Sequence, residues 1–385
     1  MRASSQGQDD VAAVNALLER RAEAVRTGDR AAFLATIDPR ATPGFREQEA
    51  RSFDGLRTVP LAGYTLRART DDTGDLGTGL GERYGGAPVF LPETRATYRI
   101  EGYDDRDQVD THWYTYVQRG ERWYVAGDTD LEDLGLLSAR NLWDFGPVAA
   151  LRSDHLLVLS RPEQAERAQA LLALGDEAVQ ALLQRWDQPW SGRIPVLLPA
   201  SPEELGRIIQ ATFDVEKYVA FVTYGPVRDD GYVTTAPRMY IQDRNLARHT
   251  RSFQLETLVH ELNHAAVAPY AGPAVPAWVH EGVADWLATG RPTGTRRPGG
   301  SDGILPRDYE ILTGSAAAIL RSYRESTSAI SYLAARFGPE APPRLLRALG
   351  EAGPVAGSVD HHVDATLRTL FGLSLAEFER GWRTR

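Results

Sequence analysis

The first third of the chain changes from a helical spacing of apolar residues to a strand-like one. Residues 11–27 carry apolar side chains at intervals of three and four, which predicts an amphipathic helix that ends at Gly28. Strand-like stretches follow at 61–69, 95–103, 109–118 and 122–126, and the last two alternate in side-chain type about a Gly-containing turn. Helices followed by such a meander predict a curved antiparallel sheet over helices.

The rest of the chain has a mainly helical pattern. Residues 136–152 contain the glycines and the proline of a junction. Beyond it, the spacing predicts a long helix over 164–186 between two short strands, and further helices to the end. The sequence therefore predicts an α+β protein with an accessory domain at 9–135, and a mainly helical domain with a small mixed sheet at 153–385.

One segment of the first domain is similar to a known fold. Residues 26–34, Arg-Thr-Gly-Asp-Arg-Ala-Ala-Phe-Leu, resemble the opening of nuclear-transport-factor-like cone domains. This resemblance implies a curved sheet wrapped over helices. No acid and base in this part have a convincing spacing for catalysis, so we expect an accessory domain that can bind a protein partner.

Composition and charge remove several classes of function. The 385 residues have a net charge of -9, which argues against a nucleic-acid-binding surface. There is no cysteine, so disulfides and thiolate metal sites are excluded, and any metal must be bound by histidines and carboxylates. No apolar run approaches the ~20 residues of a membrane span.

A candidate metal site lies at residues 260–264, which read His-Glu-Leu-Asn-His. Two histidines four residues apart share one helix face and can bind one ion, while Glu261 lies beside them as a candidate base. Catalytic zinc takes three protein ligands, and Glu281, on the next predicted helix, is the candidate for the third. Asp285, one turn later, can accept the free ring N–H of a ligating histidine.

Another interpretation of this pattern is a core helix without metal. His-Glu-x-x-His can occur by chance as surface residues, but this helix is largely apolar around Leu258 and Leu262. Polar groups in a buried helix need partners, and two carboxylates on the next helix favour a metal.

The two helices resemble those of the gluzincin metallopeptidases, the thermolysin-like clan. Residues 276–284, with Pro-x-Trp-x-x-Glu-Gly-x-Ala, are similar to the peptidase MA-like proteins of high-GC bacteria. The resemblance covers about 153–385 and implies zinc bound by His260, His264 and Glu281. It also implies Glu261 as the base and Asp285 behind His260.

The same resemblance suggests further site residues. The segment 323–333 resembles the helix that carries an oxyanion-binding tyrosine in related aminopeptidases, which places Tyr323 in that role. Gluzincins hold substrate on the sheet edge before the active-site helix, so Arg238, Tyr240 and Gln242 are the candidate substrate-binding residues. This stretch lacks the amine-binding Glu of the aminopeptidases, which favours an endopeptidase.

These observations predict a zinc-dependent hydrolase of peptide bonds, acting on a peptide or protein substrate. Two alternatives stay open: a binding or scaffold protein that retains a peptidase fold, and a metal-dependent hydrolase of a non-peptide bond. Residues 1–10 are polar, unlike a signal peptide. Because relatives of this type are often exported, we expect an extracytoplasmic protein whose signal or anchor is absent from this sequence, although a cytoplasmic location is not excluded.

Overall fold

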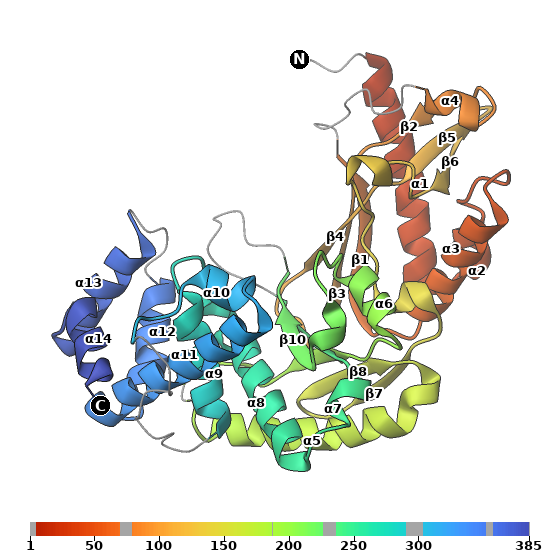
Figure 1. Cartoon of the computed structure of the whole chain (residues 1–385). Coiled ribbons are helices and arrows are strands. Elements are labelled where there is room, and N and C mark those ends of the chain that lie inside the picture. The colour runs from red at the N-terminus through yellow and green to blue at the C-terminus, as the bar shows by residue number, and fades with distance from the viewer. Residues whose placement is uncertain are drawn as a thin grey trace. The chain divides into compact units, whose positions relative to one another are not determined.

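The computed structural model describes residues 5–69, 79–186, 188–225, 236–289, 303–351 and 357–384. It has the predicted α+β class, with helices, small antiparallel sheets and one mixed sheet (Figure 1). The chain divides into two compact units. The N-terminal unit comprises Met1–Arg152, Leu157–Ala170 and Pro195–Tyr218, and the C-terminal unit comprises Ser153–Leu156, Leu171–Ile194 and Val219–Arg385.

The N-terminal unit begins with the predicted amphipathic helix. Its described helices are α1 (Ser5–Thr27), α2 (Arg30–Leu34), α3 (Pro43–Leu56), α4 (Leu80–Arg83) and α6 (Pro202–Ile208). Two three-stranded antiparallel sheets follow α3, one in the order β1-β3-β4 and one in the order β2-β5-β6. Their bounds are β1 Leu61–Ala68, β2 Val89–Phe90, β3 Thr94–Ile100, β4 Gln108–His112, β5 Thr115–Arg119 and β6 Arg122–Gly127.

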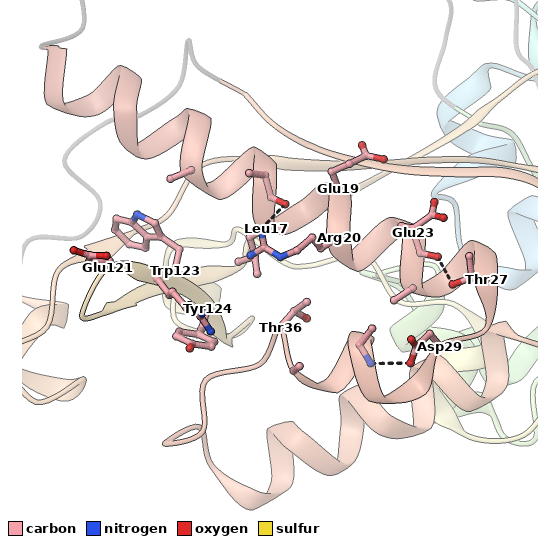
Figure 2. Close-up of a pocket in the computed structure, with 16 residues that line it drawn as sticks. Leu17, Glu19, Arg20, Glu23, Thr27, Asp29, Thr36, Glu121, Trp123 and Tyr124 are labelled. Carbon is pink, nitrogen blue, oxygen red and sulfur yellow. Dashed lines mark hydrogen bonds between the residues drawn. The ribbon is translucent and has the colours of Figure 1, made fainter.

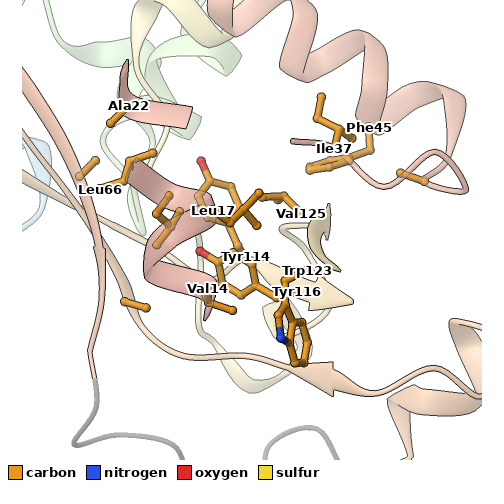
Figure 3. Packing of buried hydrophobic residues seen from close by; sticks show 14 residues of the cluster. Val14, Leu17, Ala22, Ile37, Phe45, Leu66, Tyr114, Tyr116, Trp123 and Val125 are labelled. Atoms are coloured by element: carbon orange, nitrogen blue, oxygen red, sulfur yellow. The ribbon is translucent and has the colours of Figure 1, made fainter. Parts of the chain in front are cut away.

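The core of this unit lies between α1 and the sheets (Figure 3). Apolar residues at the helical spacing of α1 pack against inward-facing residues of both sheets, as the pattern predicted. The cluster contains Val14, Leu17, Leu18, Ala22, Ile37, Phe45, Leu66, Ala96, Tyr114, Tyr116, Trp123 and Val125.

The prediction of one continuous strand over 109–118 is wrong. The chain leaves one sheet after His112 and enters the other at Thr115. The side chains of His112 and Tyr114 are both buried and their rings stack with centroids 5.1 Å apart. Because residues on both sides of this break are buried, the regular alternation of the sequence did not reveal it. The hairpin turn between β5 and β6 lies where predicted.

A five-stranded mixed sheet has the order β10-β11-β9-β8-β7. Its strands are β7 (Ala149–Arg152), β8 (Leu156–Ser160), β9 (Ile194–Leu197), β10 (Ala220–Thr223) and β11 (Arg238–Ile241). Helix α5 (Ala165–Leu183) connects β8 to β9, and backbone hydrogen bonds from Ile194 to His155 and from Leu198 to Leu159 show that these strands run parallel.

The C-terminal unit is mainly helical after this sheet. It contains α7 (Asp243–Leu246), α8 (Arg251–Val267), α9 (Ala277–Thr289), α10 (Asp308–Leu312), α11 (Ala316–Phe337), α12 (Ala341–Glu351), α13 (Val359–Phe371) and α14 (Leu375–Arg383). Helix α9 packs against both α8 and α11. Within the described residues, no helix combines the length and apolar character required to span a membrane.

Candidate metal centre

Helices α8 and α9 bring together three side chains of types that can bind a metal. The Nε2 atoms of His260 and His264, one turn apart on α8, are 3.0 Å from each other. Glu281 Oε2, from α9, lies 3.3 Å from Nε2 of His260 and 3.5 Å from Nε2 of His264. Among the described residues, these three side chains have ligand atoms close enough together to hold one ion.

The local sequence explains why these helices form and meet. Thr250 caps α8 by accepting the backbone N–H of Phe253, and the buried face of α8 is apolar around Leu258 and Leu262. Helix α9 begins directly after Pro276. Gly282 allows α9 to approach α11 closely, because a Cβ at this position would lie 2.8 Å from the backbone oxygen of Ser326.

The donor set fits a zinc ion. Ligands held at about 2.0–2.2 Å in a tetrahedron lie about 3.3–3.6 Å from one another. The two nitrogen–oxygen separations, 3.3 and 3.5 Å, match this range, and the nitrogen–nitrogen separation of 3.0 Å is slightly shorter. Glu281 Oε2 is also buried and has no hydrogen-bond partner among the described residues, so an ion would satisfy it.

A hydrogen-bonded chain runs outward from His260. Asp285 Oδ1 lies 2.8 Å from His260 Nδ1, which leaves Nε2 free to face the other two ligand atoms. Thr327 Oγ1, from α11, donates to Asp285 Oδ2 at 2.8 Å. The structure therefore places Asp285 at His260, where the resemblance implied it, and adds Thr327.

His264 has different surroundings. Its Nδ1 atom is buried without a hydrogen-bond partner in the described part of the chain. Its ring instead stacks on His280, with centroids 4.7 Å apart and planes at 11°. Burial, followed by the neighbouring His264, lowers the pKa of His280 to about 3, so His280 is neutral at physiological pH.

Burial and neighbouring charges shift the pKa values of the side chains at this site. Burial lowers the pKa of His260, but the neighbouring carboxylates of Asp285 and Glu281 outweigh it, so this pKa lies well above its ordinary value. Burial acts to raise the pKa of Glu281, yet the two histidines hold it well below its usual range. Burial raises the pKa of Glu261, which makes this carboxylate a stronger base than one in water.

Two tyrosines face the site. Tyr323, on α11, has its ring centroid 6.2 Å from that of His260 and lies near the carboxylate of Glu281. Tyr224, directly after β10, donates its hydroxyl to the backbone oxygen of His264 at 3.2 Å. Burial and the charge of Glu281 raise both tyrosine pKa values, so both hydroxyls keep their protons.

The prediction that residues 238–242 form a sheet edge is wrong. Strand β11 lies between β10 and β9, so both of its edges are occupied, and among the described strands β10 is the outer one. The side chains of Arg238, Tyr240 and Gln242 are also buried, with exposures of 6, 6 and 8%. The sequence could not show that β10, four residues long, would pair on the outside of β11.

The N-terminal unit contains a groove of its own, with a volume of about 1170 Å³ (Figure 2). Helix α1 forms one wall, and Trp123 and Tyr124 of β6 form another. Glu19, Glu23 and Glu121 line the groove, but Glu19 and Glu23 are already paired with Arg26. Nothing in this groove resembles the convergence of ligands on α8 and α9.

The site residues that the sequence did not reveal are Tyr224, His280 and Thr327. Each contributes through a tertiary contact, and none belongs to a spaced metal-binding pattern. The one sequence signal is that Thr327 follows Tyr323 by one helical turn, as Asp285 follows Glu281.

Comparison of this protein with known protein families, curated proteins and solved structures finds no match.

Proposed function

We propose that this protein is a zinc-dependent metallopeptidase of the gluzincin type, acting as an endopeptidase. The observation that carries the proposal is the convergence of His260, His264 and Glu281 with a buried carboxylate, Glu261, next to the first ligand. A zinc ion held there would polarise a carbonyl group and acidify a water molecule.

Glu261 is proposed as the general base. It is buried, its pKa is raised, and no arginine or lysine among the described residues pairs with it. A carboxylate in this state can take a proton from water and pass it to the leaving amine. Tyr323 keeps its hydroxyl proton and is proposed to donate it in a hydrogen bond to the developing oxyanion.

Substrate binding is proposed at β10 in place of β11. Among the described strands β10 is at the edge of its sheet, and Tyr224, which follows it, contacts the backbone of His264. An extended peptide can add to such an edge through main-chain hydrogen bonds. This arrangement supports cleavage within a chain, because backbone pairing does not require a free terminus.

The test is the substitution Glu261→Gln, with Glu256→Gln as the matched control on an exposed position of the same helix. We expect Glu261→Gln to bind zinc and to lose hydrolysis by about 10²–10⁴-fold, the contribution of a general base. Glu256→Gln should cleave like the wild type. If Glu261→Gln cleaves a peptide library at the parent rate, the base assignment is wrong.

The peptide library also separates the alternatives. Defined cleavage sites support the peptidase. Zinc binding without cleavage of any peptide supports either a scaffold that retains the fold or a hydrolase of a non-peptide bond. The N-terminal unit keeps its proposed role of binding a protein partner, for which the groove beside α1 is a candidate surface.

A further inference from the structure

Helices α9 and α11 face each other with polar residues at matching intervals. Glu281 and Asp285 are one turn apart on α9, and Tyr323 and Thr327 are one turn apart on α11. Tyr323 lies near Glu281, where burial and the charge of Glu281 raise the pKa of its hydroxyl, and Thr327 Oγ1 lies 2.8 Å from Asp285 Oδ2. Two polar contacts, one turn apart, therefore connect the helices beside the metal-binding residues.

Gly282 allows these contacts, because it lies where the two helices approach each other too closely for a Cβ atom. A Cβ there would be 2.7 Å from Ile330 Cγ1 and 2.8 Å from the backbone oxygen of Ser326. Backbone atoms of a helix cannot move aside individually. A larger residue would therefore separate the helices and lengthen both polar contacts.

The contact of Thr327 continues through Asp285 to His260. Asp285 accepts from His260 through Oδ1 and from Thr327 through Oδ2, each at 2.8 Å. A carboxylate held at both oxygens is fixed in rotation as well as in position. We propose that Thr327 is a positioning residue for zinc: it orients Asp285, which in turn holds His260 Nε2 toward Glu281.

A purely helical role for Thr327 is the competing explanation. Its Oγ1 also lies 2.8 Å from the backbone oxygen of Tyr323, four residues earlier, a bond that helical threonines often form. The hydroxyl has one proton, and a charged carboxylate is a stronger acceptor than a carbonyl. The Asp285 side chain is 31% exposed, so water can replace part of the hydroxyl's effect, and we expect a moderate loss on its removal.

The inference rests on the proposed metal site, so its test measures zinc affinity and not peptide cleavage. The dissociation constant for Zn²⁺ is measured by competition with a chromophoric chelator. Thr327→Val removes the hydroxyl but keeps the shape, and should weaken zinc binding about tenfold, the lower end of the effect of such partners. Thr327→Ser restores the donor and should bind zinc like the wild type.

Two controls separate the proposed role from the helical one. Thr369→Val removes the same type of bond, from Thr369 to the backbone oxygen of Ala365, on α13, and should leave zinc affinity unchanged. In an Asp285→Ala background, Thr327→Val should produce no additional loss, because its effect passes through Asp285. Losses that add in the double variant would overturn the proposal. Thr327→Ala replaces the valine variant if the latter does not fold.

The outcomes distinguish this inference from the proposed function. Wild-type protein that binds zinc, loses affinity in Thr327→Val and cleaves no peptide supports the positioning role and contradicts the peptidase. Equal zinc affinity in the wild type and Thr327→Val overturns the positioning role and leaves the peptidase standing.

Discussion

The carboxylates of the candidate metal site have different neighbours from the buried carboxylates of the N-terminal unit. In the N-terminal unit the buried acids each pair with an arginine: Glu49 with Arg21, Asp38 with Arg119 and Asp128 with Arg140. In the C-terminal unit Glu261 and Glu281 lie together beside two histidines, and no arginine or lysine of the described residues pairs with either.

This difference indicates where the compensating positive charge comes from. A buried carboxylate is unfavourable by several kcal/mol unless a cation or hydrogen bonds compensate it. The N-terminal unit supplies that cation from its own sequence. Around Glu261 and Glu281, the described residues of the C-terminal unit supply titratable imidazoles and no arginine or lysine partner, an arrangement that suits an ion bound from solution.

The largest contrast should appear when one carboxylate is neutralised in each unit. Glu49→Gln leaves Arg21 buried without its anion and should lower the free energy of unfolding by about 3–5 kcal/mol, without changing zinc affinity. Glu281→Gln leaves no arginine unpaired, so metal-free protein should lose less stability. Its zinc affinity should fall more than about 100-fold, because mutation of a residue that only positions a metal ligand already weakens metal binding by about 10–100-fold.

Denaturant unfolding in the presence of a chelator measures the change in unfolding free energy. Competition with a chromophoric chelator measures the change in zinc affinity. If Glu49→Gln weakened zinc binding as much as Glu281→Gln, the contrast between the units would be lost.

Two histidines with lowered pKa values, one in each unit, should each contribute to the dependence of stability on pH. Burial lowers the pKa of both His112 and His280 to about 3, below the value of an unfolded histidine. Their stabilising contribution is therefore complete above the unfolded pKa of about 6.5 and is lost as the pH falls toward about 3. Each histidine should contribute at most about 1.4 kcal/mol per pH unit in this window.

Phenylalanine variants test this dependence. His112→Phe and His280→Phe should each flatten the decline in unfolding free energy between neutral pH and pH 4, measured with chelator present. His280→Phe keeps a ring against His264 and should retain zinc binding. A pH profile unchanged in both variants would contradict the assignment of buried neutral imidazoles.

A smaller contrast is expected between two helical glycines. Gly282→Ala forces a Cβ against Ser326 and Ile330 and should destabilise the protein by about 1–3 kcal/mol. Gly44→Ala, in α3, meets nothing within 4 Å and should stabilise the protein by about 0.4–1 kcal/mol through the unfolded state. Thermal unfolding measures the predicted loss of stability in Gly282→Ala and the predicted gain in Gly44→Ala. Destabilisation by Gly44→Ala would show that a Cβ does not fit at this position of α3.

Local patterns in the sequence predicted those features that depend on local spacing. Helix α1 follows from its apolar period, and the turn between β5 and β6 from its Gly-containing loop. The approach of the His260 and His264 rings on α8 follows from their spacing of four residues. These features could be predicted because one helical turn or one hairpin fixes them.

Features that depend on packing between distant segments could not be predicted in this way. The change of sheet between His112 and Thr115 occurs where the rings of His112 and Tyr114 stack on each other and are buried. The contacts of Thr327 and of His280 depend on how closely helices approach, which in the case of Thr327 is decided by Gly282. The position of β11 inside its sheet depends on a partner strand that is too short to give a clear pattern.

The most direct test of the metal centre is the zinc content of protein purified without chelator. We compare the wild type with His264→Ala and with His249→Ala, whose histidine precedes α8 and stacks on Phe253 instead of facing the site. The account predicts about one zinc per chain in the wild type and His249→Ala, and none in His264→Ala. Wild-type protein that binds no zinc, even after zinc is added, would contradict the central claim that α8 and α9 form a metal site.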